Sequence, residues 1–220
     1  MRFFLLFLLI SPIFGYIQEI QEDQDQEECV EEDGLQQDAG ISVRKTIYTT
    51  RCRDDYQIFY RKNQKTAAWC LKIKFSQNPI SQVTAKKMCA EDGAVLSLFD
   101  NEEESKQLFA KLSAAETNNQ FVRIDGERKS HCHSDQSIRS DPSCRAGEAF
   151  NMLNSQTDPN FTKNSFLPGD PNYAFKDPNP NAENCLTIWT NRQKIIDNAC
   201  VPSPPQGPIR GVLCGKEPED

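Results

Sequence analysis

The chain has 220 residues, of which 25 are Lys or Arg and 32 are Asp or Glu, and its formal net charge is −7. This length suits one medium domain with tails, or two very small domains. Only 37% of the residues are hydrophobic, and beyond the first ten residues no stretch approaches the roughly 20 apolar residues that cross a bilayer. A multi-span membrane protein is therefore excluded. The acidic balance argues against a nucleic-acid partner, because neutralising phosphates requires a concentrated basic face.

Residues 1–15 have the pattern of a secretory signal peptide. Arg2 supplies the positive start, Phe3 to Ile10 form an uninterrupted apolar run, and a small residue, Gly15, ends the segment. An uncleaved anchor helix is the alternative, but Pro12 and the acidic residues that follow make it too short and wrongly flanked. We therefore expect cleavage near Gly15 and a secreted, extracellular protein whose cysteines form disulfides.

Residues 16–46 are expected to be a disordered acidic segment. Nine acidic residues and almost no apolar ones lie between Gln18 and Asp33, so this stretch cannot bury enough surface to offset its chain entropy. Without these nine residues and Arg2, the chain from Gly34 onward has 23 acidic and 24 basic residues. The negative charge therefore belongs to this segment and not to a charged binding face on the domain.

Residues 47–216 have the pattern of one mixed α+β domain, and 217–220 are expected to be a short C-terminal tail. Aromatic and alternating residues near 56–60 and over 69–75 predict the first strands. The order of elements that follows, helix, short strand and second helix, also indicates an α+β fold.

Two helices are predicted in the first half of this domain. The first covers Ser81–Asp92, with Gly93 in the place of a C-terminal cap. A short apolar strand follows over 94–99, and then Asn101 with Glu104 forms the sequence pattern of a capping box. The apolar positions of the second helix, at helical spacing, are Leu108, Phe109 and Leu112.

Regular periodicity stops after Gly126. Residues 127–184 are rich in Asn, Asp, Ser, Gly and Pro, and this region is far longer than a normal connection. A compact domain tolerates such a region when it is functional or is held by crosslinks or ions. The sequon Asn160-Phe161-Thr162 lies within it, and we expect Asn160 to be glycosylated.

The histidines offer little support for zinc binding or catalysis. His131-Cys132-His133 could be considered a metal motif, but three consecutive residues cannot surround a tetrahedral ion, and no second ligand pair has zinc-like spacing. The chain has 2 histidines, so a catalytic site of the Ser/His/Asp or Cys/His type would have to use one beside a cysteine expected in a disulfide. An enzyme is therefore not expected.

This pattern resembles the C-type lectin-like domain, in the style of secreted invertebrate members of the long form. The features that it shares with that domain are two helices, short strands, a long irregular second half and cysteines late in the chain. The resemblance covers roughly Cys52 to Gly215. The motifs that carry it are Ala85–Cys89, Gly93–Leu96, Asn101–Glu104, Phe121–Gly126, Gly169–Asn172, Glu183–Ile188, Asp197–Cys200 and Gly211–Lys216. It implies an α+β fold with two helices, short antiparallel strands and a long irregular loop region, stapled by disulfides.

The resemblance also implies a pairing of cysteines. The pairs that match family positions are Cys89 with Cys214, Cys185 with Cys200, and the N-terminal hairpin pair Cys52 with Cys70. Cys132 and Cys144, twelve residues apart in the polar loop, are expected to form a local staple. Eight of the 9 cysteines are then paired. Cys29 is left over, and we expect it to be free or to link two chains in a disulfide-bonded dimer.

Family members that bind sugar hold a calcium ion on the long loop, because Ca²⁺ takes roughly 6 to 8 oxygen ligands and can include sugar hydroxyls among them. The resemblance maps the calcium ligands onto Asp170, Asn172, Glu183 and Asp197, and the carbohydrate contacts onto Asp170, Asn172 and Glu183. Ile196 stands where the family has Asn, which removes one ligand and one sugar-facing amide, and Ile195 stands where it has Trp.

The register of this loop is left open by the sequence. A second Asp-Pro-Asn motif lies at 177–179, closer to Glu183. Asp, Asn and Pro also dominate turns for backbone reasons alone, so Asp170, Asn172 and Asp177 have an ordinary explanation as loop residues. Calcium binding is therefore expected to be weak or absent.

The function implied by the resemblance is secreted recognition of a glycan or an extracellular protein, in a setting such as host defence. Carbohydrate binding through a degenerate calcium site is the first hypothesis. The alternative is calcium-independent protein recognition or assembly by the same fold. Calcium occupancy of the loop separates these two hypotheses.

Overall fold

The computed structural model describes residues 51–61, 67–112, 121–153, 157–174 and 179–219. The predicted signal peptide, the predicted acidic segment and Cys29 lie outside these residues and stay predictions. No helix in the described ranges is both long enough and apolar enough to span a bilayer.

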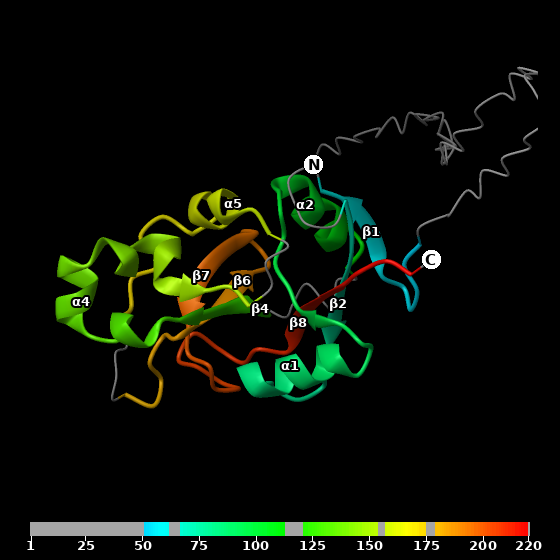
Figure 1. Ribbon diagram of the computed structural model, residues 1–220. Coiled ribbons are helices and arrows are strands. Elements are labelled where there is room, and N and C mark those ends of the chain that lie inside the picture. Colours follow the sequence, from blue (N-terminus) through cyan, green and yellow to red (C-terminus); the bar gives the residue numbers. More distant parts are fainter. Residues whose placement is uncertain (1–50, 62–66, 113–120, 154–156, 175–178, 220) are drawn as a thin grey trace, which may run out of the picture. The chain divides into compact units, whose positions relative to one another are not determined.

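An eight-stranded sheet organises the described part of the chain (Figure 1). Its main path runs in the order β1 (Gln57–Tyr60), β2 (Ala68–Phe75), β8 (Gly211–Lys216), β4 (Phe121–Arg128), β6 (Cys185–Trp189) and β7 (Lys194–Asn198). Two short strands, β3 (Val95–Leu96) and β5 (Phe150–Asn151), pair with β8 and β4. β4 and β8 run parallel, and the other pairs run antiparallel.

Helix α1 (Gln82–Ala90) lies where the sequence predicts the first helix. The Ser81 hydroxyl oxygen accepts a hydrogen bond from the Thr84 amide at 3.1 Å and so caps its first turn. Gly93 follows the helix with a φ of 66°, a left-handed conformation that favours glycine. The chain then turns into β3, which is shorter than the predicted strand.

Helix α2 (Glu102–Ala110) forms the predicted cap only in part. The side-chain oxygen of Asn101 accepts a hydrogen bond from the Glu104 amide at 2.9 Å. The Glu104 carboxylate instead accepts two hydrogen bonds from the Arg61 guanidinium, at 2.8 and 2.6 Å, and both side chains are buried. An unpaired buried charge costs more free energy than the loss of a second capping hydrogen bond at a helix terminus.

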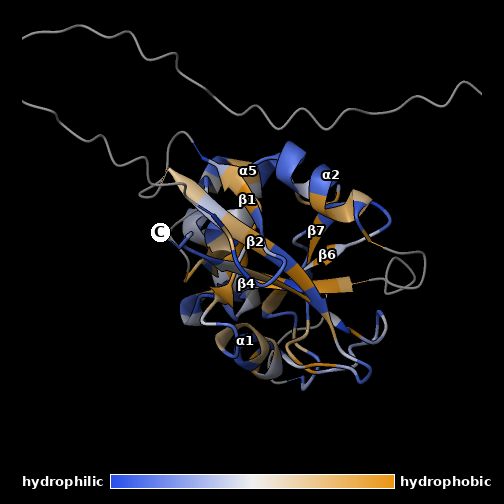
Figure 2. Cartoon of the chain, turned by 90° about the vertical axis from the view of Figure 1, so that its right-hand side faces the viewer, coloured by the Kyte–Doolittle hydropathy of each residue, from blue (hydrophilic) through white to orange (hydrophobic). Residues whose placement is uncertain are grey.

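The two faces of the sheet are buried in two different clusters. Along β8, Val212 and Cys214 belong to the cluster that includes Ala85 of α1, whereas Leu213 belongs to the cluster that includes Leu108 of α2. Successive residues alternate because side chains of a strand point to opposite faces. The sheet therefore lies between α1 on one side and α2 on the other (Figure 1 and Figure 2).

The long region after β4 contains short helices that its composition does not reveal. Two of them have six residues each, α4 (Asp135–Ser140) and α5 (Pro159–Asn164). Ser134 and Ser137 form a capping box at α4, and the Asp158 side chain accepts from the Asn160 amide at α5. Helices this short carry less than two turns of periodicity, so local capping defines them.

Four disulfides join the described cysteines, in the pairs Cys52–Cys70, Cys89–Cys214, Cys132–Cys144 and Cys185–Cys200. These are the pairs that the sequence analysis expects. The 89–214 bond ties α1 to the central strand β8. At the C-terminus, Glu219 forms backbone hydrogen bonds with Arg51 at 3.3 and 3.0 Å, so this expected tail adjoins the start of the described domain.

Candidate functional site

The residues expected to bind calcium line one cavity of about 270 Å³. They are Asp170, Asn172, Glu183 and Asp197, and the same cavity is also lined by apolar side chains that include Trp189 and Ile196. The motif that reaches this cavity is therefore the one at 170–172. In the second motif, Asn179 is not among the lining residues and instead accepts a hydrogen bond from the Asn181 amide at 2.8 Å, while Asp177 lies outside the described residues.

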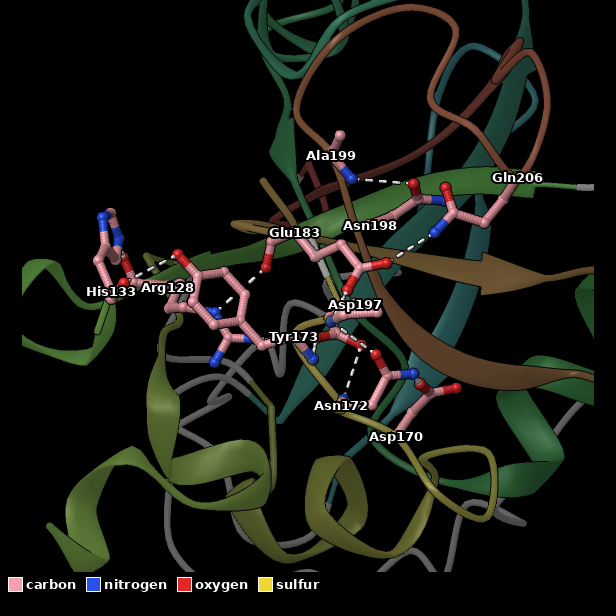
Figure 3. A network of polar contacts seen from close by, with 11 residues as sticks. Arg128, His133, Asp170, Asn172, Tyr173, Glu183, Asp197, Asn198, Ala199 and Gln206 are labelled. Carbon is pink, nitrogen blue, oxygen red and sulfur yellow. Dashed lines mark hydrogen bonds and ion pairs between the residues drawn. The ribbon is translucent and has the colours of Figure 1, made fainter. Parts of the chain in front are cut away.

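Asp197 is the centre of this site (Figure 3). It lies on β7, and the residue is 2% exposed. Its Oδ1 accepts a hydrogen bond from the Asn172 amide at 3.1 Å, and its Oδ2 accepts from the Tyr173 amide at 2.8 Å. The Arg128 Nη2 also donates to Oδ2 at 2.8 Å. Both carboxylate oxygens thus already have nitrogen donors.

Arg128 is the buried cation of the site. Its guanidinium lies over the rings of Phe150 and Tyr173, 4.6 and 4.2 Å from their centroids, and its Nε donates to the Glu183 carbonyl at 3.1 Å. Burial lowers the pKa of Arg128 and raises the pKa of Asp197, and in each case the charge of the partner opposes the shift. We therefore treat the two side chains as an ion pair.

Glu183 and Asn172 also use their oxygens within the protein. Glu183 is 2% exposed, and its carboxylate accepts hydrogen bonds from the Ala174 amide at 2.5 Å and from the Gln206 side chain at 2.7 Å. The side-chain oxygen of Asn172 accepts from the same Ala174 amide at 2.8 Å. Consecutive backbone amides at 172–174 are therefore held by two buried carboxylates.

Asp170 is the remaining carboxylate and is only partly buried. It precedes a cis peptide bond to Pro171 and accepts a hydrogen bond from the Asn172 side chain. Burial and then the negative charge of Asp197 raise the pKa of Asp170 from its ordinary value of 3.8 to about 6, although the hydrogen bond from Asn172 opposes this shift. Asp170 is therefore held next to a like charge.

The variant Asp170→Asn is expected to be more stable than the wild type at about pH 7.5 but not at about pH 4. The folded protein holds the Asp170 proton more tightly than the unfolded chain does, so this group's contribution to stability is complete below its ordinary pKa of 3.8 and is lost as pH rises through about 6. Because solvent screens this partly exposed group, we expect Asp170→Asn to raise the free energy of unfolding at about pH 7.5 by roughly 1 kcal/mol. This corresponds to an increase of about 2 to 4 °C in melting temperature.

Melting curves of the two proteins between about pH 4 and 8 test this expectation. Asp55→Asn is the matched control, because it removes the same charge from an exposed position. A difference between wild type and Asp170→Asn that does not change with pH would contradict the explanation.

The residues present do not fit a calcium site. The oxygens of Asp197, Glu183 and Asn172 already accept hydrogen bonds from N–H groups. Ile196, 6% exposed, lies in the apolar cluster on the α1 side of the sheet and offers no side-chain oxygen. Among the described residues, the carboxylate oxygens of Asp170, Glu183 and Asp197 do not form a group in which all three lie within 4.8 Å of one another.

Three potential metal ligands whose donor atoms do lie within 4.8 Å of one another are His131, Cys132 and Cys144. Cys132 and Cys144 form a disulfide, so their sulfurs are not available as thiolate ligands. Ser143 and Asp141 also lie beside His131, but the Ser143 hydroxyl donates to Asp141 at 2.7 Å. A catalytic triad requires the acid to orient the histidine and the histidine to take the serine proton, which this arrangement does not provide.

The comparisons with known proteins agree with this fold. The sequence model of the C-type lectin domain-containing protein 141/158 family matches residues 58–217. The chain belongs to this family. C-type lectin domain-containing protein 158 of Caenorhabditis elegans is 28% identical over 162 residues, which are 67% of this chain and 76% of the relative.

The chain is also similar to solved structures of C-type lectin domains at low identity. The cow C-type carbohydrate-recognition domain of CD23, solved in the presence of a GlcNAc2Man3 oligosaccharide, has a TM-score of 0.50 and 14% identity, and the match covers 78% of this chain and 100% of that one. The carbohydrate-recognition domain of the mouse scavenger receptor C-type lectin has a TM-score of 0.47 and 15% identity, covering 77% and 100%. The family match and the likeness to the CD23 domain confirm the C-type lectin-like fold predicted from the sequence.

The family resemblance did not indicate Arg128 or Gln206, which complete the site of this C-type lectin-like domain. Arg128 lies between Glu127 and Lys129, in a charged run that is typical of a solvent-exposed surface. Its partner Asp197 is 69 positions away in the sequence. The local signal is that Arg128 ends a strand that begins with the apolar residues Phe121, Val122 and Ile124.

Proposed function

We propose that this protein is an extracellular recognition protein of the C-type lectin type that binds its ligand without calcium. The observation that carries the proposal is the buried ion pair between Arg128 and Asp197, at 2.8 Å, with side chains 2% and 0% exposed. This pair gives Asp197 a positive partner that belongs to the protein itself.

The hydrogen bonds of the loop support the same proposal. A calcium ion in such a loop both neutralises carboxylates and orders the backbone. Here Arg128 supplies the neutralising charge, and Asp197 and Glu183 accept the backbone amides of residues 172–174. A loop ordered in advance loses less conformational entropy when a partner binds. We infer a preformed recognition surface for a glycan or an extracellular protein.

Several finer features belong to this proposal. We propose secretion on the basis of the predicted signal peptide. We propose a disulfide-linked dimer on the basis of Cys29, and a role in host defence on the basis of the resemblance alone. Asn160 is exposed on α5 and is the proposed glycosylation site. Because Thr162 of the same sequon is 3% exposed, the modification would precede folding of this helix. No enzymatic activity is proposed.

Carbohydrate binding through a degenerate calcium site is the second candidate function. It is favoured by the position of Asp170 and Asn172, which line the same cavity as Trp189. A sugar in this cavity could contact the partly buried carboxylate and the aromatic ring. The hydrogen bonds that Asp197 and Glu183 already accept within the protein make this the weaker candidate.

We expect calcium to leave the melting temperature of the full chain unchanged relative to a chelator. A site with a Kd of about 10⁻⁴ M would stabilise the folded protein by about 2.3 kcal/mol at about 5 mM calcium. For a domain of this size, that corresponds to a shift of roughly 5 to 9 °C. Thermal melts in calcium, in magnesium and in chelator measure this difference directly.

Immobilised mannose and galactose provide the matching binding assay. Retention of the wild type in calcium with release by chelator would contradict the proposal and support the second candidate. The variant Ile196→Asn restores the amide that the family has at this position. If it creates such retention where the wild type has none, the loop retains the geometry of a sugar site but has lost its function.

A further inference from the structure

A second concave surface has no lining residue in common with the Asp197 cavity. It is a groove of about 410 Å³ between the start of α2, the end of α5 and the turn that joins β6 to β7. Both helices cover the same side of the sheet (Figure 1 and Figure 2). The lining residues that could contact a ligand are Glu102, Phe161, Asn164, Asn191, Arg192 and Lys194.

The groove contains two cations, Arg192 and Lys194. Within the described residues, neither Arg192 nor Lys194 has a carboxylate partner. Arg192 is exposed, and its guanidinium lies over the Trp189 ring at 4.8 Å from the centroid. Stacking holds a planar guanidinium in one orientation and leaves its N–H groups available for an anion.

The other polar groups of the groove are amides and hydroxyls. In the part of the chain that the structure describes, the side chains of Asn164, Asn191 and Gln193 make no hydrogen bond with another residue, and all three are exposed. Phe161 contributes a partly buried aromatic ring. Amides can pair with hydroxyl groups in both directions, and an aromatic ring can pack against an apolar face.

One lining residue is acidic. Glu102 is exposed, and its carboxylate pairs with Lys106 at 3.3 Å along α2. Its charge is therefore partly compensated within the helix, and the groove has a net excess of positive charge.

We propose that this groove binds an acidic saccharide, a sugar unit that carries a carboxylate or a sulfate. Arg192 and Lys194 receive the anionic group, the amides pair with hydroxyls, and Phe161 packs against the ring of the sugar. Guanidinium groups recognise carboxylates and sulfate-like oxyanions through paired hydrogen bonds. The proposal adds a second ligand surface to the proposed recognition function and needs no metal.

Binding of a heparin-derived tetrasaccharide to the full-length protein tests the proposal, by calorimetry and by tryptophan fluorescence. We expect binding in chelator, which weakens at least about tenfold in Arg192→Gln/Lys194→Gln. The matched control is Lys87→Gln/Arg139→Gln, which removes the same two charges from exposed positions on α1 and α4 and should change binding less than about twofold. Lys87, Arg139 and Arg192 are exposed and Lys194 is partly exposed, so melting curves should show that the variants fold.

Three outcomes would overturn the proposal. The first is absence of binding, including the case in which the protein binds anionic lipid vesicles but not the tetrasaccharide. The second is equal weakening by the control pair, which would indicate non-specific attraction of charge. The third is equally tight binding of an uncharged N-acetylglucosamine tetramer. None of them affects the calcium experiment, because that experiment uses the unsubstituted chain, and neither Arg192 nor Lys194 lines the Asp197 cavity.

Discussion

Replacing Arg128 with methionine is expected to lower the free energy of unfolding by about 3 to 5 kcal/mol, because it leaves a buried carboxylate without its partner. Asp197 is 2% exposed and would keep the backbone amides of residues 172 and 173 as donors but no cation. Methionine preserves much of the apolar contact with the rings of Phe150 and Tyr173. The loss is therefore mainly electrostatic.

The pH dependence distinguishes this explanation from lost packing. Without the guanidinium, burial raises the pKa of Asp197 further, so the variant should be less destabilised at low pH, where the carboxyl is protonated, than at neutral pH. The double variant Arg128→Met/Asp197→Asn removes both charges and should recover part of the stability. Urea unfolding at two pH values measures all three proteins. A cost below about 1 kcal/mol for Arg128→Met would mean that the pair does not hold the loop.

Removing the disulfide Cys89–Cys214 should cost more than removing any local crosslink. The bond closes a separation of 125 residues, against 12 for Cys132–Cys144. In the chain-entropy model these loops contribute about 5 and about 3 kcal/mol. The first bond also joins α1 to β8 across a cluster in which both cysteines are fully buried. We therefore expect the double alanine variant of this pair to be largely unfolded.

The matched comparison is the double alanine variant of Cys132 and Cys144, which should stay folded and bind the same probes. Circular dichroism with urea titration gives the two free energies, and peptide mapping without reduction confirms the remaining bonds. Equal destabilisation by the two variants would show that loop length does not control the contribution of these disulfides.

Three arginines among the described residues of the domain are buried, and the tertiary structure determines their hydrogen-bond partners. Arg123 is fully buried in β4, and its guanidinium donates to the carbonyls of Ala199 at 2.7 Å and Val201 at 2.5 Å. Burial lowers the pKa of Arg123 to about 9. Together with Arg61 and Arg128 it forms a set of cations inside the domain, each held by groups more than 35 positions away in the sequence.

By itself, the sequence determined the elements that local rules control. Ser81 and Gly93 bound the first helix because capping and left-handed backbone depend on neighbouring residues. The order of motifs around the cysteines identified the family and the disulfide pairs. The same resemblance predicted that Asp197 and one of the two Asp-Pro-Asn motifs share a site, and the structure places Asp170 and Asp197 in one cavity.

Only the tertiary structure decided what those residues do there. Strand pairing places Arg128 of β4 beside Asp197 of β7 across the sheet, and burial turns an apparent surface charge into the partner of that carboxylate. The short helices α4 and α5 and the groove beside Arg192 likewise arise from contacts between distant segments. The free energy of a charged group depends on its solvation and on its partners, and neither is encoded in the residues next to it.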